Sequence, residues 1–126
     1  MRAGPQANKF GAFLMKNLRD AAIDDADALL AAHWKAPSLK ALQADLAKLT
    51  PKQRSVVRRC VIRAIDTGIH DFLFALSEEH DAGGRIAVVV DGKDVASQSD
   101  GLHGEPFTEE GWYSKFSKHG APTDRA

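Results

Sequence analysis

The sequence predicts an α+β fold: a small helical bundle around one long central helix, with a C-terminal β-hairpin and a short C-terminal helix. Up to a Gly-Gly pair at 83–84, apolar residues recur at spacings of three and four, which is typical of amphipathic helices. After that pair, residues 85–98 alternate around an Asp-Gly step at 91–92, which indicates a two-residue hairpin turn. The 126 residues are enough for one domain with its own core, which we place over residues 1–126.

The N-terminal part of the sequence predicts an arm followed by helix. Residues 1–8 are mostly polar and include glycine and proline, so we expect a loose arm. Helical spacing begins at Phe10 and continues at Leu14. Acidic residues at 24–27 can cap a second helix. The sequence leaves open whether residues 10–35 form one bent helix or two.

The next predicted helix carries a narrow stripe of leucines. An Ala-Pro step at 36–37 interrupts the preceding helix, because proline disfavours helical backbone at the residue before it. Four leucines follow at positions 39, 42, 46 and 49. This spacing predicts an amphipathic helix of about three turns. A homodimer built on the stripe is a possible assembly if the central helix cannot cover it.

The central helix has the clearest start in the sequence. Thr50, Pro51 and Gln53 stand where a capping box places its N-cap, N1 and N3 residues, and they predict a helix over about 51–80. Apolar residues cover about half of its circumference, so we expect several elements to pack on it. Gly68 lies inside this apolar sector and predicts a close approach by a neighbouring element.

The C-terminal third predicts a hairpin, a loop and a short helix. A lone hairpin is only marginally stable in water, so we expect residues 85–98 to lie on the helices, with Ile86 and the alternate valines after it facing inward. Thr108 is the predicted N-cap of a helix that ends before Gly120. Residues 120–126 are expected to form a loose tail.

Composition and charge narrow the function classes. The 17 Lys and Arg residues balance 17 Asp and Glu residues, so the net charge is zero and we expect no nucleic-acid partner. Cys60 is the only cysteine, which excludes an internal disulfide and a cysteine-based zinc cluster. No apolar run is long enough to span a membrane, and no secretory leader is recognisable. We therefore expect a soluble cytoplasmic protein without a membrane partner.

One candidate site lies on the central helix. Arg59, Arg63, Asp66 and His70 follow one another at spacings of four, three and four and share one helix face, opposite the apolar sector. A carboxylate beside an imidazole can set up a general base, so a small hydrolase or metal-binding enzyme that uses Asp66, His70 and Asp71 is the alternative function. A solvated face with pairs between neighbouring charges explains the same pattern.

The His-Asp pairs at 70–71 and 80–81 raise the question of a metal site. Helical His-Asp pairs ligate metals in one class of phosphohydrolases, and His33 could serve as a further ligand. The aspartates that follow residue 81 fall in the predicted hairpin or loop, where that pattern needs helix. We therefore predict no metal site and no cofactor.

A basic patch marks the first half of the central helix. It consists of Arg54, Arg58, Arg59 and Arg63, in a stretch that contains no acid. Such a cluster can meet phosphates or an acidic partner. No aromatic residues lie among these arginines, so we expect them to pair instead with the acidic C-terminal third of the chain.

The loop after the hairpin is the predicted contact region. Its candidate binding residues are Asp100, His103, Glu105, Trp112 and Tyr113, and an exposed patch that carries Trp112, Tyr113 or Phe107 would indicate a binding module. Function concentrates in loops held by rigid elements, and a His–Glu pair beside aromatic rings can form a pocket or a partner hot spot. A structural turn whose aromatic rings fill the core is the alternative interpretation. The sequence leaves open whether His70 and His103 come close in space.

These observations together favour binding over catalysis. The nucleotide-binding and hydrolase motifs that spacing can reveal are absent from the sequence. We predict a protein-interaction module of inhibitor, immunity or adaptor type that uses residues 97–113 to contact another protein.

Overall fold

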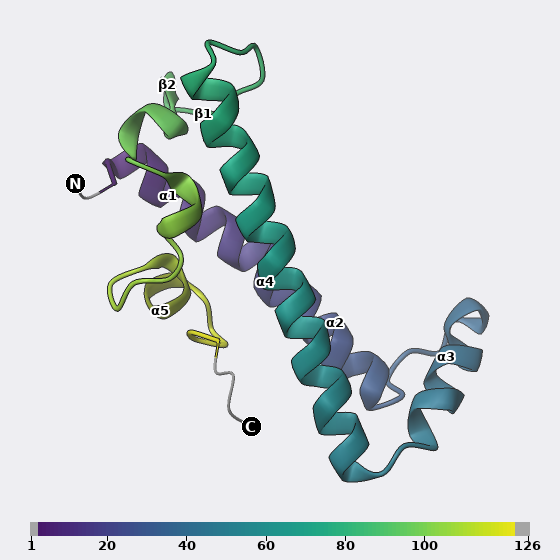
Figure 1. The fold of residues 1–126 in the computed structure, drawn as a ribbon. Helices are drawn as coiled ribbons and strands as arrows, with labels where there is room; N and C mark the ends of the chain where they lie inside the picture. Colours follow the sequence, from purple (N-terminus) through teal and green to yellow (C-terminus); the bar gives the residue numbers. More distant parts are fainter. Residues whose placement is uncertain (1–2, 123–126) are drawn as a thin grey trace.

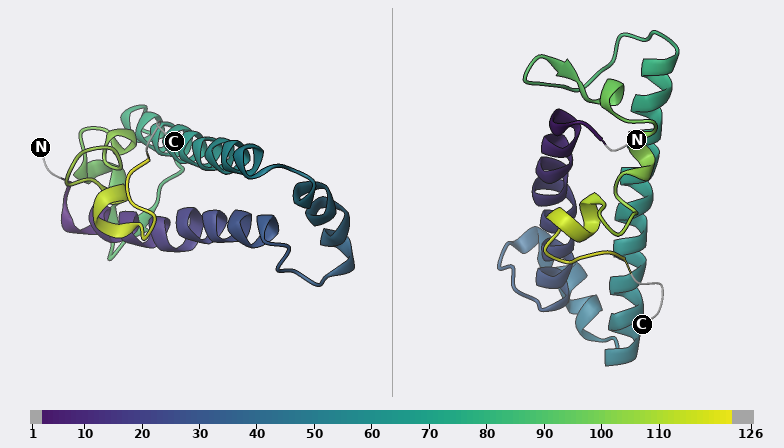
Figure 2. Two further views of the ribbon diagram at one scale, coloured as in Figure 1. Left: turned by 90° about the horizontal axis from the view of Figure 1, so that it is seen from below. Right: turned by 90° about the vertical axis from the view of Figure 1, so that its left-hand side faces the viewer.

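The computed structural model describes residues 3–122 and confirms the α+β fold. Its helices are α1 (Pro5–Leu14), the π-helical turn η1 (Met15–Asp20), α2 (Ala21–Leu30), α3 (Pro37–Ala47), α4 (Pro51–Asp81) and α5 (Trp112–Phe116). A two-stranded antiparallel hairpin, β1 (Val89–Val90) and β2 (Lys93–Asp94), leads into two short 3₁₀ turns, η2 (Val95–Gln98) and η3 (Leu102–Gly104). Two long helical rods run side by side in opposite directions, and α3 joins them at one end (Figures 1 and 2).

The first rod is one continuous helix. Met15 and Ala21, at the two ends of η1, both keep right-handed helical backbone angles, so α1, η1 and α2 follow one another without a break. The rod ends after Leu30, and Ala32 adopts a positive φ of 54°. This answers the question of one helix or two in favour of one, with a π-helical turn in its middle.

The prediction of a loose arm over residues 1–8 is wrong for residues 5–8, because helix α1 already begins at Pro5. Residues 1–2 lie outside the described part of the chain. Ala7 is fully buried, and its backbone N–H donates to the side-chain oxygen of Gln98 at 2.8 Å. The N–H of Gly4 donates to the backbone carbonyl of Gln98 at 3.0 Å. The first N–H groups of a helix have no intrahelical acceptor, and here Gln98 accepts hydrogen bonds from two N–H groups at the helix start. Sequence reasoning could not foresee this, because Gln98 is distant in the chain.

The second rod is α4, and its predicted start is confirmed. The Thr50 side chain accepts from the N–H of Gln53, whose side chain in turn accepts from the N–H of Thr50. The expected packing is only partly present. Ile69, Leu73 and Leu76 are buried, but Phe72 is 49% exposed. A Cβ added to Gly68 would meet nothing within 4 Å, so the close approach predicted there is wrong.

The core lies between the first rod and the second half of α4, and the C-terminal segments fill it. Its buried members include Phe10, Leu14, Leu73, Leu102 and Trp112. The backbone after α4 folds back over this end of the molecule, as the green and yellow segments of Figure 2 show. Helix α3 packs against α2 at the opposite end.

The hairpin is shorter than predicted. Its Asp91-Gly92 turn has positive φ at both residues, which is the type I′ geometry expected of that step. Beyond the two paired residues of each strand, the N–H of Val95 still donates to the Val88 carbonyl at 3.0 Å. The Asp94 side chain accepts from the N–H of Ala96 and starts η2, which ends the strand. Ile86, expected to face inward, is 67% exposed, whereas Val95 is fully buried.

Helix α5 also starts later than predicted. Its N-cap is Gly111 rather than Thr108. A Cβ on Gly111 would come within 2.6 Å of the Glu105 carbonyl oxygen, so glycine allows the helix start to rest on the preceding loop. The N–H of Trp112 donates to that same carbonyl at 3.1 Å. Of the predicted tail, residues 123–126 lie outside the described part of the chain.

In residues 3–122, no helix has both the length and the apolar character needed to cross a lipid bilayer.

Candidate functional site

A buried ion pair joins Arg19 of η1 to Asp66 of α4. Arg19 Nε donates to Asp66 Oδ1 at 2.7 Å, and Nη2 donates to Oδ2 at 3.2 Å. Arg19 Nη1 donates to the Ser117 hydroxyl at 2.8 Å and to the Gly120 carbonyl at 2.7 Å. The guanidinium carbon lies 4.2 Å from the centre of the Tyr113 ring. One arginine therefore links the first rod, α4 and the C-terminal segment.

This pair corrects the predicted role of Asp66. The helical spacing placed Asp66 on a solvated face, where it would orient His70. Instead its side chain is only 6% exposed, and Arg19 occupies both carboxylate oxygens. The sequence offered no indication of Arg19, because its partner lies 47 residues away on another helix.

A second polar cluster fixes the C-terminal segment on the first rod. Asp20 accepts from the Ser117 hydroxyl at 2.5 Å and from the backbone N–H of Lys118 at 3.1 Å. Asp24 lies 2.6 Å from Lys118 Nζ and 2.9 Å from His119 Nε2. These hydrogen bonds, first from Lys118 and then from His119, lower the pKa of the Asp24 carboxyl. Gly120, expected in a loose tail, is therefore anchored.

Above this support, four rings form what we call the aromatic–histidine surface: His70 and Phe74 of α4, His103 of η3, and Phe107 of the loop after it. The centres of the two histidine rings lie 5.4 Å apart. The Phe74 and His103 rings are 5.1 Å apart, and the His70 and Phe107 rings are 6.1 Å apart. Phe74 is 44% exposed and Phe107 is 50% exposed, so apolar ring area faces solvent here. His70 and His103 thus share one site.

The other residues predicted in this loop are placed differently. Glu105 is half-buried and accepts from the Ser99 hydroxyl at 3.0 Å, while Asp100 is exposed. Trp112 and Tyr113 are 1% and 0% exposed, which corrects the expectation that their rings form a contact surface. They are buried because α5 packs against the first rod, where Trp112 Nε1 donates to Asn8 Oδ1 at 3.1 Å. Phe74, which sequence reasoning missed, provides exposed ring area instead.

Two of the buried polar atoms near the site have no hydrogen-bond partner among the described residues. They are Nδ1 of His103 and the hydroxyl oxygen of Tyr113. Burial, and then the negative charge of Asp66, raises the pKa of the Tyr113 hydroxyl. The Tyr113 ring also supports the surface from beneath, since its centre lies 5.2 Å from that of Phe107.

The predicted basic patch divides into two parts. Arg54 donates to the backbone carbonyls of Leu46 and Leu30, and Arg58 donates to both carboxylate oxygens of Asp27 at 2.7 and 3.2 Å. These two arginines therefore join α4 to α2 and α3. The sequence-based expectation that they pair with the acidic C-terminal third is wrong. The hydrogen bond with Asp27 raises the pKa of Arg58.

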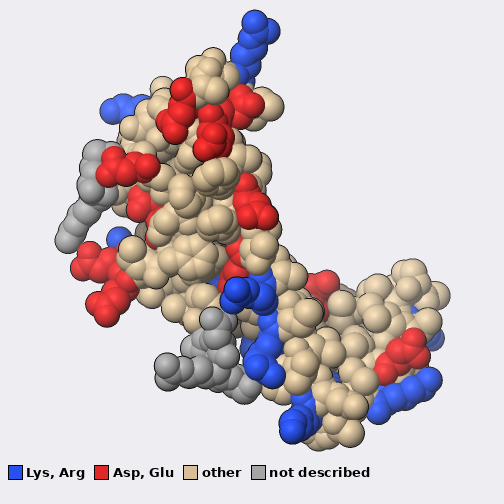
Figure 3. All heavy atoms as spheres, viewed as in Figure 1, with Lys and Arg blue, Asp and Glu red and all other residues tan. Residues whose placement is uncertain are grey.

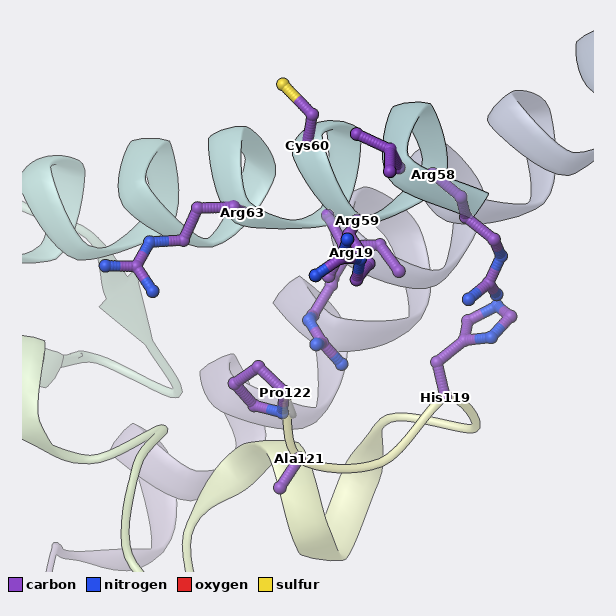
Figure 4. Close-up of a pocket in the computed structure, with 10 residues that line it drawn as sticks. Arg19, Arg58, Arg59, Cys60, Arg63, His119, Ala121 and Pro122 are labelled. Atoms are coloured by element: carbon purple, nitrogen blue, oxygen red, sulfur yellow. The ribbon is translucent and has the colours of Figure 1, made fainter. Parts of the chain in front are cut away.

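The other two arginines, Arg59 and Arg63, line two adjoining hollows on the face of α4. The first, of about 400 Å³, is the arginine hollow, lined by Arg19, Arg58, Arg59, Arg63 and His119 among others. The second, of about 490 Å³, includes Arg63, Thr67, His70 and Phe107 in its lining. Arg63, Ala121 and Pro122 border both hollows. In Figure 4 the Arg58 side chain extends toward His119 of the C-terminal segment, whereas Arg63 extends to the left, away from Pro122, and Cys60 points away from the hollow.

Charge changes sign along this face. Blue side chains follow the lower half of α4 in Figure 3, and red side chains surround its upper half. The aromatic–histidine surface lies toward the acidic end, where Asp71 is 72% exposed beside His70. The face therefore offers apolar rings at one end and guanidinium groups at the other.

The chemistry available to His70 is limited by its neighbours. Its Nδ1 lies 3.1 Å from Asp71 Oδ1, a pair that solvent can screen. His80 Nδ1 lies 3.3 Å from Asp94 Oδ2 rather than pairing with Asp81. No group of three or more His, Cys, Asp or Glu side chains in residues 3–122 is arranged to hold a metal ion.

Comparison with family models, with curated proteins and with solved structures gave no match.

Proposed function

We propose that this chain is a protein-interaction module of inhibitor, immunity or adaptor type, and that the aromatic–histidine surface contacts its partner. The observation that carries the proposal is that Phe74 and Phe107 are both exposed, with the Phe74 ring against His103 and the Phe107 ring against His70. Aromatic residues at the centre of an interface supply much of the binding energy, and contiguous exposed apolar area is typical of such sites.

The rigid support of these rings adds to the proposal. Leu102 and Pro106, on either side of His103, are fully buried, and the N–H of Leu102 donates to the Ser77 hydroxyl of α4 at 3.1 Å. The backbone that carries His103 and Phe107 is therefore anchored on α4 before a partner arrives. Preorganisation of this kind reduces the entropy lost on binding.

The hydrolase hypothesis at Asp66, His70 and Asp71 has less support. Asp66 is engaged by Arg19, so of the two carboxylates only Asp71 pairs with His70. Its exposed position gives a weakly held imidazole, while a general base needs a firmly oriented one. We keep this hypothesis as the function to screen if no partner is found.

The remaining expectations concern location and assembly. We expect a cytoplasmic protein, because the single cysteine, Cys60, is exposed on α4 and an exposed thiol suits a reducing compartment. A homodimer through the α3 stripe also stays a prediction. Leu42 is 48% exposed, and the other three leucines of the stripe are half-buried.

Affinity capture with matched variants tests the proposal. Tagged wild-type protein, a Phe74→Ser, Phe107→Ser double variant and a Phe72→Ser control are used to capture proteins from nuclease-treated extract of the native cells. Phe72 is a sound control because it is 49% exposed on the same helix, yet residues two apart on a helix face nearly opposite ways. We expect one stoichiometric partner with wild type and control and its loss with the double variant, provided that the circular dichroism of all three proteins is alike.

Two results would oppose the proposal. If the double variant captures the same protein in the same amount, the contact lies elsewhere on the molecule. If well-folded wild-type protein captures nothing, the binding function itself is rejected and hydrolase screening around His70 follows.

A further inference from the structure

We infer that two copies of this chain pair through one exposed face of α4, antiparallel and related by a two-fold axis. Each copy then places the basic start of its α4 beside the acidic end of the other α4, and the pairing covers Phe74. This inference goes beyond the proposed function, because it concerns the isolated chain and names a second copy as the occupant of this face.

What we call the α4 face consists of exposed residues that follow one another at helical spacing. They are Val56, Cys60, Thr67, Asp71, Phe74 and Glu78. At 3.6 residues per turn these positions lie within about 60° of one another around the helix. Val56 is 47% exposed and Phe74 is 44% exposed, so the face carries apolar area in both halves of α4. In both views of Figure 2, α4 runs along one edge of the molecule, where a second helix can approach it.

Charge reverses along this side of α4, as Figure 3 shows. Residues 51–63 contain no acid, whereas residues 67–81 contain no lysine or arginine. Lys52 near one end and Glu78 and Asp81 near the other are exposed, and none of these three forms an ion pair within residues 3–122. These charges are therefore not compensated by the described part of the chain itself.

The arginines of the basic half do not enter the argument. Arg54, Arg58 and Arg63 already interact with groups of the protein. Arg59 lines the arginine hollow, beside the C-terminal segment. The positive charge that a second copy would meet on the α4 face is therefore that of Lys52.

The spacing of these residues matches an antiparallel pair of α4 helices. Val56 and Phe74 lie nine residues on either side of position 65, and Lys52 and Glu78 lie thirteen residues on either side of it. A two-fold axis at that level brings Val56 opposite Phe74 and Lys52 opposite Glu78, and each contact is made twice. Asp81 follows about 4.5 Å further along the axis, within reach of the same lysine. A parallel pair would instead place like charges side by side.

Apolar and charged contacts favour this pairing together. The contact between Val56 and Phe74 removes apolar area from water, and the opposite charges at both ends fix the orientation. Cys60 and Thr67, which lie between them, are short and allow two helices to approach to about 8–10 Å. One helix pair makes a small interface, so we expect a reversible dimer with a dissociation constant on the order of 10–100 µM.

The pairing has a consequence for the aromatic–histidine surface. Phe74 belongs to both that surface and the α4 face, so a second copy and another partner cannot cover its ring at once. At low concentration the chain is a monomer whose ring is accessible, and self-association at high concentration competes with partner binding.

Sedimentation equilibrium of the purified full chain tests the inference. Lys52→Glu and Glu78→Lys each place like charges opposite one another in a pair of identical chains, so each should weaken self-association by about tenfold or more. Both side chains are exposed, and circular dichroism checks that the variants fold as wild type does. The affinity of the wild-type dimer should also fall as salt rises.

A mixture of the two variants is the sharpest test. In a mixed pair, each introduced charge faces an opposite charge at both ends of the contact, so the affinity should return close to that of wild type. Val56→Ser should weaken the dimer through lost apolar contact. The control Lys40→Glu reverses an exposed charge on α3 and should change nothing.

Three results would overturn the inference. One is a wild-type chain that stays monomeric up to about 500 µM, well above the expected dissociation constant. Another is a dimer that neither charge variant weakens, or a mixture of the variants that stays monomeric. The third is a dimer that Leu42→Ser removes and Lys52→Glu does not, because the contact would then lie on α3.

Failure here is distinguishable from failure of the proposed function. Sedimentation uses the purified chain alone, whereas the capture experiment reads a different protein. Loss of the dimer with Lys52→Glu while that variant still captures the partner would support both conclusions, since Lys52 lies outside the aromatic–histidine surface.

Discussion

At the scale of single residues, the buried Arg19–Asp66 pair is the link that brings the site together. Both side chains are almost inaccessible, and every donor that Arg19 uses meets an oxygen of α4 or of the C-terminal segment. Burial of two charges is costly, and it is offset here by well-aligned hydrogen bonds. The cost of losing one partner is therefore larger than the net contribution of the pair.

Replacement of Arg19 by methionine should be strongly destabilising. The change leaves the Asp66 carboxylate buried without its partner, so we expect the free energy of unfolding in a urea titration to fall by about 3–5 kcal/mol. A combined Arg19→Met, Asp66→Leu variant should recover much of that loss. The exposed Lys9–Asp91 pair is the control, and Lys9→Ala should cost less than about 1 kcal/mol. A loss for Arg19→Met as small as this control would show that the pair does not hold the fold together.

The single tyrosine gives a pH-dependent prediction. Burial raises the pKa of Tyr113 above its ordinary value of 10.0, so the hydroxyl is protonated in the folded state where the unfolded chain would ionise it. Stability from this group is complete below about pH 10 and is lost as the pH rises above that value. Ultraviolet absorbance should show no phenolate until the protein unfolds in alkali. Normal titration of the folded protein near pH 10 would contradict the buried position.

A companion variant checks the same group at neutral pH. Tyr113→Phe removes a buried hydroxyl that has no hydrogen-bond partner among the described residues, so we expect it to be neutral or slightly stabilising. It should also remove the part of the alkaline loss of stability that the Tyr113 hydroxyl causes.

At the scale of elements, the contact between α1 and α5 decides where the C-terminal segment lies. A Cβ on Gly11 of α1 would come within 2.3 Å of the Trp112 ring, so the absence of a side chain allows the indole to lie on the helix. Phe10 meets the same ring edge-on, with centres 6.2 Å apart. The glycine that the sequence marked as a close approach, Gly68, faces open space instead.

Two alanine substitutions should therefore change stability in opposite directions. Gly11→Ala forces the Trp112 ring to move and should cost about 1–3 kcal/mol. Gly68→Ala adds a methyl group at an open, exposed position inside a helix and should stabilise by about 1 kcal/mol. Thermal unfolding of both variants checks whether the melting temperature falls for Gly11→Ala and rises for Gly68→Ala. Stabilisation by Gly11→Ala would mean that Trp112 does not pack where the structure places it.

The elements themselves were predictable where their causes are local. The capping box at Thr50 and the Asp91-Gly92 turn depend only on neighbouring residues, and both are present as predicted. The start of α5 was not predictable, because it depends on a backbone hydrogen bond between Trp112 and Glu105 in a loop whose path the sequence does not show. The end of strand pairing at Asp94 has a local cause, the hydrogen bond that the Asp94 side chain accepts from the N–H of Ala96, and sequence reasoning missed it.

The candidate site was predictable only as a region. Loop composition indicated His103 and its neighbours, and helical spacing indicated His70, but their proximity depends on how the C-terminal segment folds back on α4. The burial of Trp112 and Tyr113 has the same cause. Phe74 was missed because a phenylalanine beside an apolar stripe gives no indication that its ring faces solvent.

At the scale of the whole molecule, the fold is two long helical rods with the C-terminal segments fixed on one end. This arrangement builds one face on which apolar rings, two histidines and a row of arginines follow one another along α4. The opposite end, with α3, lacks such a combination in the described part of the chain. The central claim is that this one face, around Phe74 and Phe107, contacts another protein.

Hydrogen–deuterium exchange on the purified complex with the captured partner tests that claim most directly. We predict slower exchange on binding in the peptides that span residues 70–76 and 102–111, with little change in α3. Protection confined to α3, or spread evenly over the chain with none around residues 102–111, would contradict the account and place the contact elsewhere.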